Sequence, residues 1–232
     1  MDLIAEGIVR AFQLLVSGDP EVIKITLLSL AVSLSATAIS LVIGVTLGTV
    51  IGLMRFWGRR FLVSLINTGM GSPPVVVGLI VSLFLWRNGP LGILRLMYTP
   101  YAIVIAQCVI SLPIITGFTM ASIQQIDPKL RLQLAALGAS RWQLLWLLVR
   151  DTRLPLLAAV MAGFGSIISE VGAAMMVGGN ITGQTRVLTT AIVMEVGKGD
   201  FGLAVALGII LMALVYLVNL ALTVLQQRSK PR

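Results

Sequence analysis

Charged side chains are scarce in this chain of 232 residues, where Asp, Glu, Lys and Arg together make up only 11%. Histidine is absent and Cys108 is the only cysteine, which excludes an internal disulfide and the metal sites usually built from His and Cys. The phosphate-binding pattern G-x-x-x-x-G-K-[ST] is also missing, because the one Gly-Lys pair, Gly197–Lys198, is followed by glycine. Paired carboxylates are lacking too, so we expect no catalytic site, metal or cofactor in this chain.

Apolar residues dominate instead: they fill 57% of the positions, and the mean hydropathy is +1.00. A soluble domain of this size needs more polar surface, so the composition predicts an all-α integral membrane protein with one domain over 1–232. Crossing a bilayer core of about 30 Å takes roughly 20 residues in a helix. Five stretches are long enough, and they lie near 25–54, 61–86, 100–123, 155–178 and 203–225.

The N-terminal segment 3–16 precedes these spans and carries Glu6, Arg10 and Gln13 among apolar residues. It lacks the small-residue cleavage site of a signal peptide. We interpret it as an amphipathic helix at the membrane surface.

Basic residues indicate the orientation of the chain in the membrane. Eleven of the seventeen lie in 55–60, 124–154 and 226–232, which share one side if the five spans are correct. Because cytoplasmic loops carry the excess of Lys and Arg, the N-terminus is predicted outside and the C-terminus inside. The net charge of +8 then mainly reflects topology. A nucleic-acid partner is the weaker interpretation, since no basic patch with interleaved aromatic residues is present.

Small residues recur every fourth position along the first span, at Ala36, Ser40, Gly44, Gly48 and Gly52. Such a stripe allows another helix to approach closely. Packing within one subunit is favoured over a dimer interface.

The second span contains a run of residues that interrupts a helix: Gly69, Gly71, Ser72, Pro73 and Pro74. Proline removes an amide donor and disfavours helix in the residue before it. A broken helix at membrane depth often borders a substrate path, and hydroxyls and free amides near Ser72–Gly78 would solvate an anion. Ser72, Pro73, Pro74 and Gly78 are therefore candidates for the path, with an ordinary proline kink as the alternative.

The fourth span carries the only predicted intramembrane carboxylate, Glu170, next to Ser169. An ionisable group at the centre of a span costs roughly 2.5 to 3.5 kcal/mol, so Glu170 should face protein or water. Because a carboxylate repels an anion, we favour a structural or gating role for Ser169 and Glu170 over direct coordination. The following apolar segment 187–196 is too short to cross the membrane and suits a re-entrant or outer-surface helix.

The loop 124–154 is the longest on the predicted cytoplasmic side. A short helix is predicted over 130–137, ended by Gly138 in the left-handed conformation, and Ser140 is a good cap for the next helix. An apolar elbow facing the cytoplasm is typical of a docking element, and the alternative is a loop folded onto its own helices. The candidate docking residues are Leu134, Ala135, Ala136, Leu137, Gly138, Ala139, Ser140, Arg141 and Trp142.

This loop resembles the coupling segment, called the EAA loop, of type I ABC importer permeases with the MetI-like fold. Residues 138–142 fit the family pattern well, and Leu154–Pro155 supplies its Leu-Pro ending about one helical turn later than usual. The signature Glu is absent, because residues 132–134 read Leu-Gln-Leu. A contact normally made by that Glu is therefore missing, although the docking role is still expected.

Four further segments are similar to the permeases for molybdate, sulfate and tungstate. GSPPVVVGL at 71–79 resembles a Pro-Pro-Val-Val-x-Gly segment of the molybdate and sulfate permeases. NGPLG at 88–92 followed by YTPYAIVIAQ at 98–107, and SEVGAAMMVGGNITGQTRVLTTAI at 169–192, resemble the tungstate branch.

The resemblance implies a homodimer in a bacterial or archaeal cytoplasmic membrane, surrounded by lipid. Two ATP-binding subunits, which bind ATP and Mg²⁺, would grip the loops, and an extracytoplasmic binding protein would deliver the oxyanion. Transport would follow alternating access, with tungstate as the expected substrate and molybdate or sulfate as alternatives. A passive channel or secondary carrier is a further alternative, although ion-coupled carriers usually place several carboxylates in the membrane.

Overall fold

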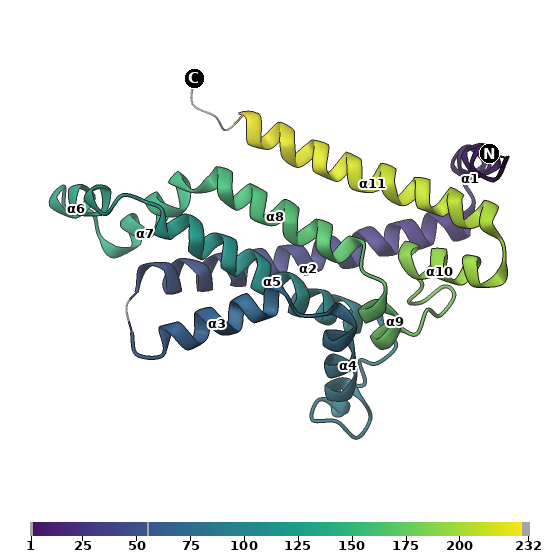
Figure 1. Cartoon of the computed structure of the whole chain (residues 1–232), viewed down its shortest axis with the longest axis horizontal. Helices are drawn as coiled ribbons and strands as arrows, with labels where there is room; N and C mark the ends of the chain where they lie inside the picture. Colours follow the sequence, from purple (N-terminus) through teal and green to yellow (C-terminus); the bar gives the residue numbers. More distant parts are fainter. Residues whose placement is uncertain (1, 55, 229–232) are drawn as a thin grey trace.

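The computed structural model describes residues 2–54 and 56–228, and these residues are helical almost throughout (Figure 1). Five helices lie side by side along the longest axis of the molecule: α2 (Pro20–Leu53), α3 (Arg59–Met70), α5 (Pro100–Gln124), α8 (Arg153–Ile168) and α11 (Phe201–Arg228). The other helices are α1 (Asp2–Ser17), α4 (Pro74–Leu85), the short 3₁₀ helix η1 (Gly92–Leu94), α6 (Pro128–Ala136), α7 (Arg141–Asp151), α9 (Gly172–Gly178) and α10 (Leu188–Lys198). The prediction of an all-α fold is confirmed.

The two ends of this bundle are occupied by different short helices. Helices α6 and α7 lie at one end, toward which α11 runs, whereas α1 and α10 lie at the other (Figure 1). The predicted helix at 187–196 is thus confirmed as α10. Helix α4 departs from the common direction, because it leaves the bundle sideways (Figure 1).

Helix α2 begins earlier than the first predicted span because Asp19 caps it. The Asp19 carboxylate accepts hydrogen bonds from the amides of Glu21 at 2.9 Å and Val22 at 3.0 Å, and Pro20 occupies the first turn, where no amide donor is needed. The resulting helix of 34 residues is about 51 Å long at 1.5 Å per residue. It therefore exceeds a bilayer core of about 30 Å.

The stripe of small residues on α2 receives α5. A Cβ atom on Gly44 would lie 2.9 Å from a methyl group of Ile115, and one on Gly48 would lie 2.6 Å from the carbonyl oxygen of Thr116. Ser40 and Ser111 share a hydrogen bond of 2.6 Å across the same interface. The two backbones come this close only because side chains are missing, and the intramolecular interpretation of the stripe is confirmed.

Three helices of the described chain, α2, α5 and α11, are long and apolar enough to cross a membrane. Two bent pairs bring the number to five if each pair counts as one span: α3 with α4, bent by 107°, and α8 with α9, bent by 60°. The first bend is far larger than an ordinary proline kink, so the interpretation of 61–86 as a broken helix is confirmed. The second divides the predicted span 155–178 into two helices, because Ser169–Val171 separate α8 from α9, and the sequence analysis did not predict this break.

Helix α1 is confirmed as a helix and packs against the beginning of α11. Gly7 lies against the side chain of Val205, and the guanidinium of Arg10 donates to the Asp200 carboxylate at 2.9 Å. Asp200 also accepts a hydrogen bond from the Leu203 amide at 2.9 Å and so caps α11. That amide hydrogen bond, followed by the charge of Arg10, lowers the pKa of Asp200.

Candidate functional site

The break between α3 and α4 has most of its polar groups satisfied locally. The Ser72 hydroxyl donates to the Thr68 carbonyl at 2.8 Å, and the Pro73 carbonyl accepts the amides of Val76 and Val77 at 3.0 and 3.2 Å. The two prolines contribute no N–H. The amide of Val75 is consequently the one donor between residues 73 and 77 without a hydrogen bond among the described residues. This corrects the expectation of several free amides near Ser72–Gly78.

The break between α8 and α9 is stabilised by Glu170. Its carboxylate accepts a hydrogen bond from the Ala173 amide at 3.0 Å, and its backbone carbonyl accepts one from the Thr189 hydroxyl at 2.9 Å. The neighbouring Ser169 is exposed, and its hydroxyl donates to the Gly165 carbonyl at 2.8 Å. A carboxylate at the start of a helix satisfies an amide that has no helical partner. The geometry therefore supports the structural role that we favoured for Glu170.

The two breaks lie together, which the sequence could not reveal. A Cβ atom on Gly78 of α4 would stand 2.6 Å from the Cα of Ala173, and one on Gly172 would stand 2.6 Å from a methyl group of Val75. Gly78 is buried, so within this chain it serves a close contact between α4 and α9. Glycine-mediated packing thus brings α4, with the path candidate Gly78, against the start of α9.

Helix α4 uses only one face for this contact. Val77, Val81 and Leu85 are buried in a cluster with Ala174 and Val177 of α9. The other face exposes large apolar side chains: Val75, Val76, Leu79, Ile80, Leu83 and Phe84. An apolar helix that extends from the bundle with an uncovered face suits a position within lipid or against another protein.

A buried amide in α5 was missed by our sequence analysis. Gln107 is 3% exposed, and its Nε2 donates to the carbonyl of Ile167 at 3.2 Å, two residues before the break between α8 and α9. Its Oε1 is buried and has no partner among the described residues. A polar side chain in the middle of an apolar span is the signal that would have identified it.

The elbow in 124–154 has the predicted shape. Helix α6 ends at Ala136, and Gly138 follows in the left-handed region with φ +79°. Ser140 begins α7 with a reciprocal cap, in which its hydroxyl accepts the Gln143 amide at 3.3 Å and its amide donates to Gln143 Oε1 at 2.8 Å. The helix–Gly–helix prediction is confirmed.

The base of the elbow is anchored and its tip is free. Leu148 of α7 is fully buried against Ile123 and Ile126, whereas Leu137 is 83% exposed and Trp142 is 82% exposed. A cavity of about 540 Å³ lies at the tip, lined by Leu134, Leu137, Gly138, Ala139, Gln143, Trp146 and Leu147. The side chains of Ala135 and Arg141 fall outside the described part. Because the apolar tip is exposed, the geometry favours docking over a loop folded onto its own helices.

The family model described as "Binding-protein-dependent transport system inner membrane component" matches residues 44–231. The tungstate uptake permease TupB of Peptoclostridium acidaminophilum is 40% identical over 227 residues, covering 98% of this chain and 100% of that protein. TupB of Campylobacter jejuni is 34% identical over 94% of this chain and 92% of its own length. The molybdenum permease ModB of Haemophilus influenzae is 27% identical over 71% of this chain and 75% of its own length.

Solved structures agree with the fold. A permease chain of a bacterial alginate ABC transporter, in complex with a pentasaccharide-bound periplasmic protein, gives a TM-score of 0.75 at 19% identity, covering 95% of this chain and 82% of that one. A chain of the MetNI methionine transporter gives 0.68 at 16% identity, covering 91% and 95%. The predicted MetI-like permease fold is therefore confirmed.

Proposed function

This chain belongs to the family of binding-protein-dependent transport system inner membrane components, and we propose that it forms the tungstate path of an ATP-driven importer. It is a multi-pass inner-membrane protein with an ABC permease fold. The observation that carries tungstate as substrate is the identity of 40% and 34% to two tungstate permeases over nearly the whole chain. Molybdate and sulfate are the second candidates, because their permeases match at 27%.

We infer the orientation in the membrane from the distribution of basic residues. We propose that the end with α6 and α7 faces the cytoplasm and the end with α1 and α10 faces outward, which places the N-terminus outside and the C-terminus inside. The excess of basic residues at the first end supports this assignment. Reversing the orientation would place most Lys and Arg residues outside, against the usual bias.

The assembly consists of two copies of this chain, two ATP-binding subunits and a binding protein outside. The exposed Leu137 and Trp142 at the elbow supply an apolar knob for a groove on the ATP-binding subunit, which holds ATP and Mg²⁺ and carries out hydrolysis. The missing signature Glu removes one polar contact there. Apolar burial and the rigid cap at Ser140 take its place.

The paired breaks act as the gate of the path. Movement of the elbow is carried along α5 and α8, because both helices continue from the anchored base of α6 and α7 to the two breaks. The glycine contacts make α4 and α9 move as one unit. Ser72, Pro73, Pro74 and Ser169 lie at the breaks, where an oxyanion passes the Val75 amide without a fixed cation. The Ser72 and Ser169 hydroxyls donate to backbone carbonyls, so they hold the breaks in shape and leave no proton for the anion. Weak binding at this place permits release, so selectivity rests mainly with the binding protein.

The test is ATP hydrolysis by the complete complex in proteoliposomes, with tungstate, molybdate and sulfate compared at matched concentrations. Stimulation by tungstate at far lower concentration than by the other anions supports the proposal. Equal responses would replace tungstate by a broader oxyanion class, and no response to any anion would refute it. Anion uptake by the permease alone, without ATP-binding subunits, would instead identify a channel or secondary carrier.

A further inference from the structure

A second cavity lies at the end of the bundle opposite the elbow. It measures about 630 Å³, which is within the roughly 300–1,000 Å³ typical of small-molecule sites. Its walls are the first turns of α2 and the loop between α9 and α10, with these lining residues: Pro20, Glu21, Lys24, Ile25, Leu27, Leu28, Ala31, Thr182, Gly183, Gln184 and Arg186. This loop includes the segment GNITGQTR, residues 179–186, which has no role in the proposed gate.

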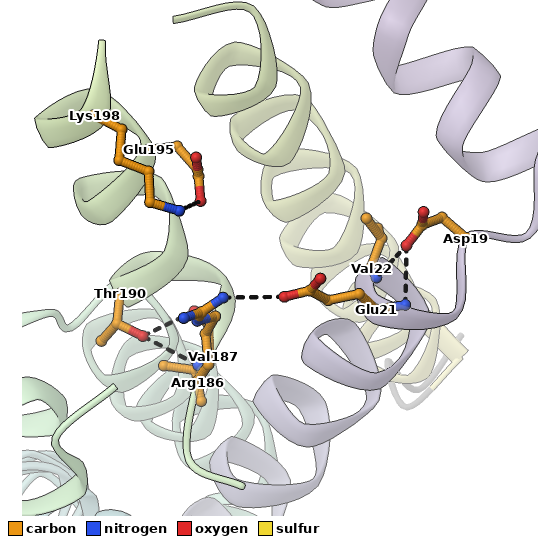
Figure 2. A network of polar contacts seen from close by, with 8 residues as sticks. All are labelled: Asp19, Glu21, Val22, Arg186, Val187, Thr190, Glu195 and Lys198. Atoms are coloured by element: carbon orange, nitrogen blue, oxygen red, sulfur yellow. Dashed lines mark hydrogen bonds and ion pairs between the residues drawn. The ribbon is translucent and has the colours of Figure 1, made fainter. Parts of the chain in front are cut away.

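Arg186 is the central polar residue of this cavity. Its side chain is only 12% exposed, and its Nη1 donates to the Glu21 carboxylate at 3.0 Å (Figure 2). Its Nε is buried and has no partner among the described residues. A guanidinium offers five N–H donors in a fork that fits oxyanions, and here only part of that capacity is used.

Lys24 adds a second positive charge to the same cavity, from the α2 wall. It is exposed, one helical turn from Glu21, and no hydrogen bond or ion pair occupies its ammonium group in the described chain. Glu21 is the only carboxylate among the lining residues. Two cations against one carboxylate leave the cavity positive, and Thr182 and Gln184 supply neutral donors beside them.

The loop that carries Arg186 is held in a fixed shape. The Thr185 hydroxyl donates to the Gly178 carbonyl of α9 at 2.6 Å and accepts the Ile181 amide at 3.0 Å. At its other end, the Leu188 amide donates to the Ser29 hydroxyl of α2 at 2.8 Å. The guanidinium is thus preorganised between α2 and α9, and α9 is one half of the gate pair.

We propose that this cavity is an extracytoplasmic oxyanion site, in which Arg186 and Lys24 hold a tetrahedral dianion before it reaches the gate. The Glu21 carboxylate occupies part of the guanidinium in the empty state, and the dianion displaces it. Since Glu21 is 58% exposed, its side chain has room to turn away into solvent. The transported anion as ligand rests on the proposed function, whereas binding of an oxyanion at Arg186 does not.

The direction in which two substitutions change the anion affinity distinguishes an anion site from a structural ion pair. If the pair only joined the loop to α2, Glu21→Gln and Arg186→Gln would both destabilise the protein without improving anion binding. At an anion site, Glu21→Gln removes a competitor and tightens binding by about two- to five-fold, since exposed ion pairs are weak. Arg186→Gln weakens it by about ten-fold or more, because charge-assisted hydrogen bonds are lost.

The experiment is equilibrium dialysis of tungstate against the permease with its ATP-binding subunits in lipid nanodiscs, without binding protein. Lys24→Gln tests the second cation with little risk to folding, because the side chain is exposed. Lys198→Gln is the matched control: it removes one charge at the same end, where Lys198 pairs with Glu195 at 2.8 Å outside the cavity (Figure 2). We expect weaker binding for Lys24→Gln and no change for Lys198→Gln.

Two results would overturn the proposal: equal loss of tungstate binding in Lys24→Gln and Lys198→Gln, or no gain of binding in Glu21→Gln.

Nanodiscs of phosphatidylglycerol and of phosphatidylcholine are compared, because a lipid phosphate could fill the same cavity. Loss of tungstate binding only in phosphatidylglycerol would assign the site to a lipid and refute our assignment. If tungstate-stimulated ATP hydrolysis is absent while this dialysis pattern holds, the proposed function fails and the anion site stands. If tungstate stimulates ATP hydrolysis but the dialysis pattern is absent, only the anion site is refuted.

Discussion

Replacing Gly78 by alanine perturbs the contact on which the proposed gate depends. The new Cβ would lie 2.6 Å from the Cα of Ala173, a backbone atom that cannot turn away. Ordinary contacts between carbon atoms are about 3.5 to 4.0 Å, so α4 and α9 must separate by about 1 Å. Overpacking of this kind typically costs about 1 to 3 kcal/mol.

Part of that cost is offset, because alanine is a better helix former than glycine by about 1 kcal/mol. For a chain of this size, 1 kcal/mol corresponds to a change in Tm of about 2 to 4 °C. We therefore expect Gly78→Ala to lower Tm by up to about 8 °C, and to impair anion-stimulated ATP hydrolysis at temperatures where the protein is still folded.

Cys108 provides the assay, since it is the only cysteine and is partly buried in α5. A thiol-reactive fluorophore reports its exposure as the detergent-solubilised protein is heated. Gly165→Ala is the matched control, because nothing lies within 4 Å of the Cβ it would add to α8, and its Tm should stay the same or rise. The reasoning is refuted if Gly78→Ala is as stable and as active as Gly165→Ala.

Three further predictions follow from local geometry. Glu170→Ala should lower the free energy of unfolding by about 1 kcal/mol, because the cap of α9 is lost. Glu170→Gln keeps a hydrogen-bond acceptor and should preserve both stability and transport. Loss of transport in a stable Glu170→Gln variant would contradict the structural role. The pKa of Asp200 is lower in the folded than in the unfolded state. The ionised Asp200 carboxylate therefore stabilises the protein above its unfolded pKa of about 3.9, and this effect is lost as pH falls through its folded pKa. Below a pH of about 3.9, Tm of Asp200→Asn should consequently depend less on pH than Tm of the wild type. Gly138 and Gly58 both adopt positive φ with no atom within 4 Å of an added Cβ. Alanine should cost about 1 to 2 kcal/mol at either position, but only Gly138→Ala should reduce ATP hydrolysis by the assembled complex; equal activity of the two variants would argue against the elbow as the docking element.

Local features of the site were predictable from the sequence because they depend on neighbouring residues. Gly138 ends α6 in the left-handed conformation and Ser140 caps α7, since both effects act within a single turn. The break at Pro73 follows from the missing amides of two consecutive prolines. The break after Ser169 carried no such mark, because glycine, valine and glutamate are compatible with a continuous helix, and it was missed.

The meeting of distant segments was outside the reach of sequence patterns. Nothing in residues 71–79 indicates that Gly78 contacts Ala173, and the pair Glu21–Arg186 joins residues 165 positions apart. Such contacts depend on the direction in which α4 leaves its 107° bend and on how α9 folds back after its own.

The membrane class, the helical segments and the elbow could be predicted from the amino-acid sequence alone. The physical reason is that the length of an apolar run, the cost of an unpaired amide and the conformation of a glycine are properties of short segments. The folded chain was needed to show that two broken helices share one contact and that Arg186 and Lys24 line one cavity, because the packing of helices depends on the shapes of surfaces assembled from remote residues.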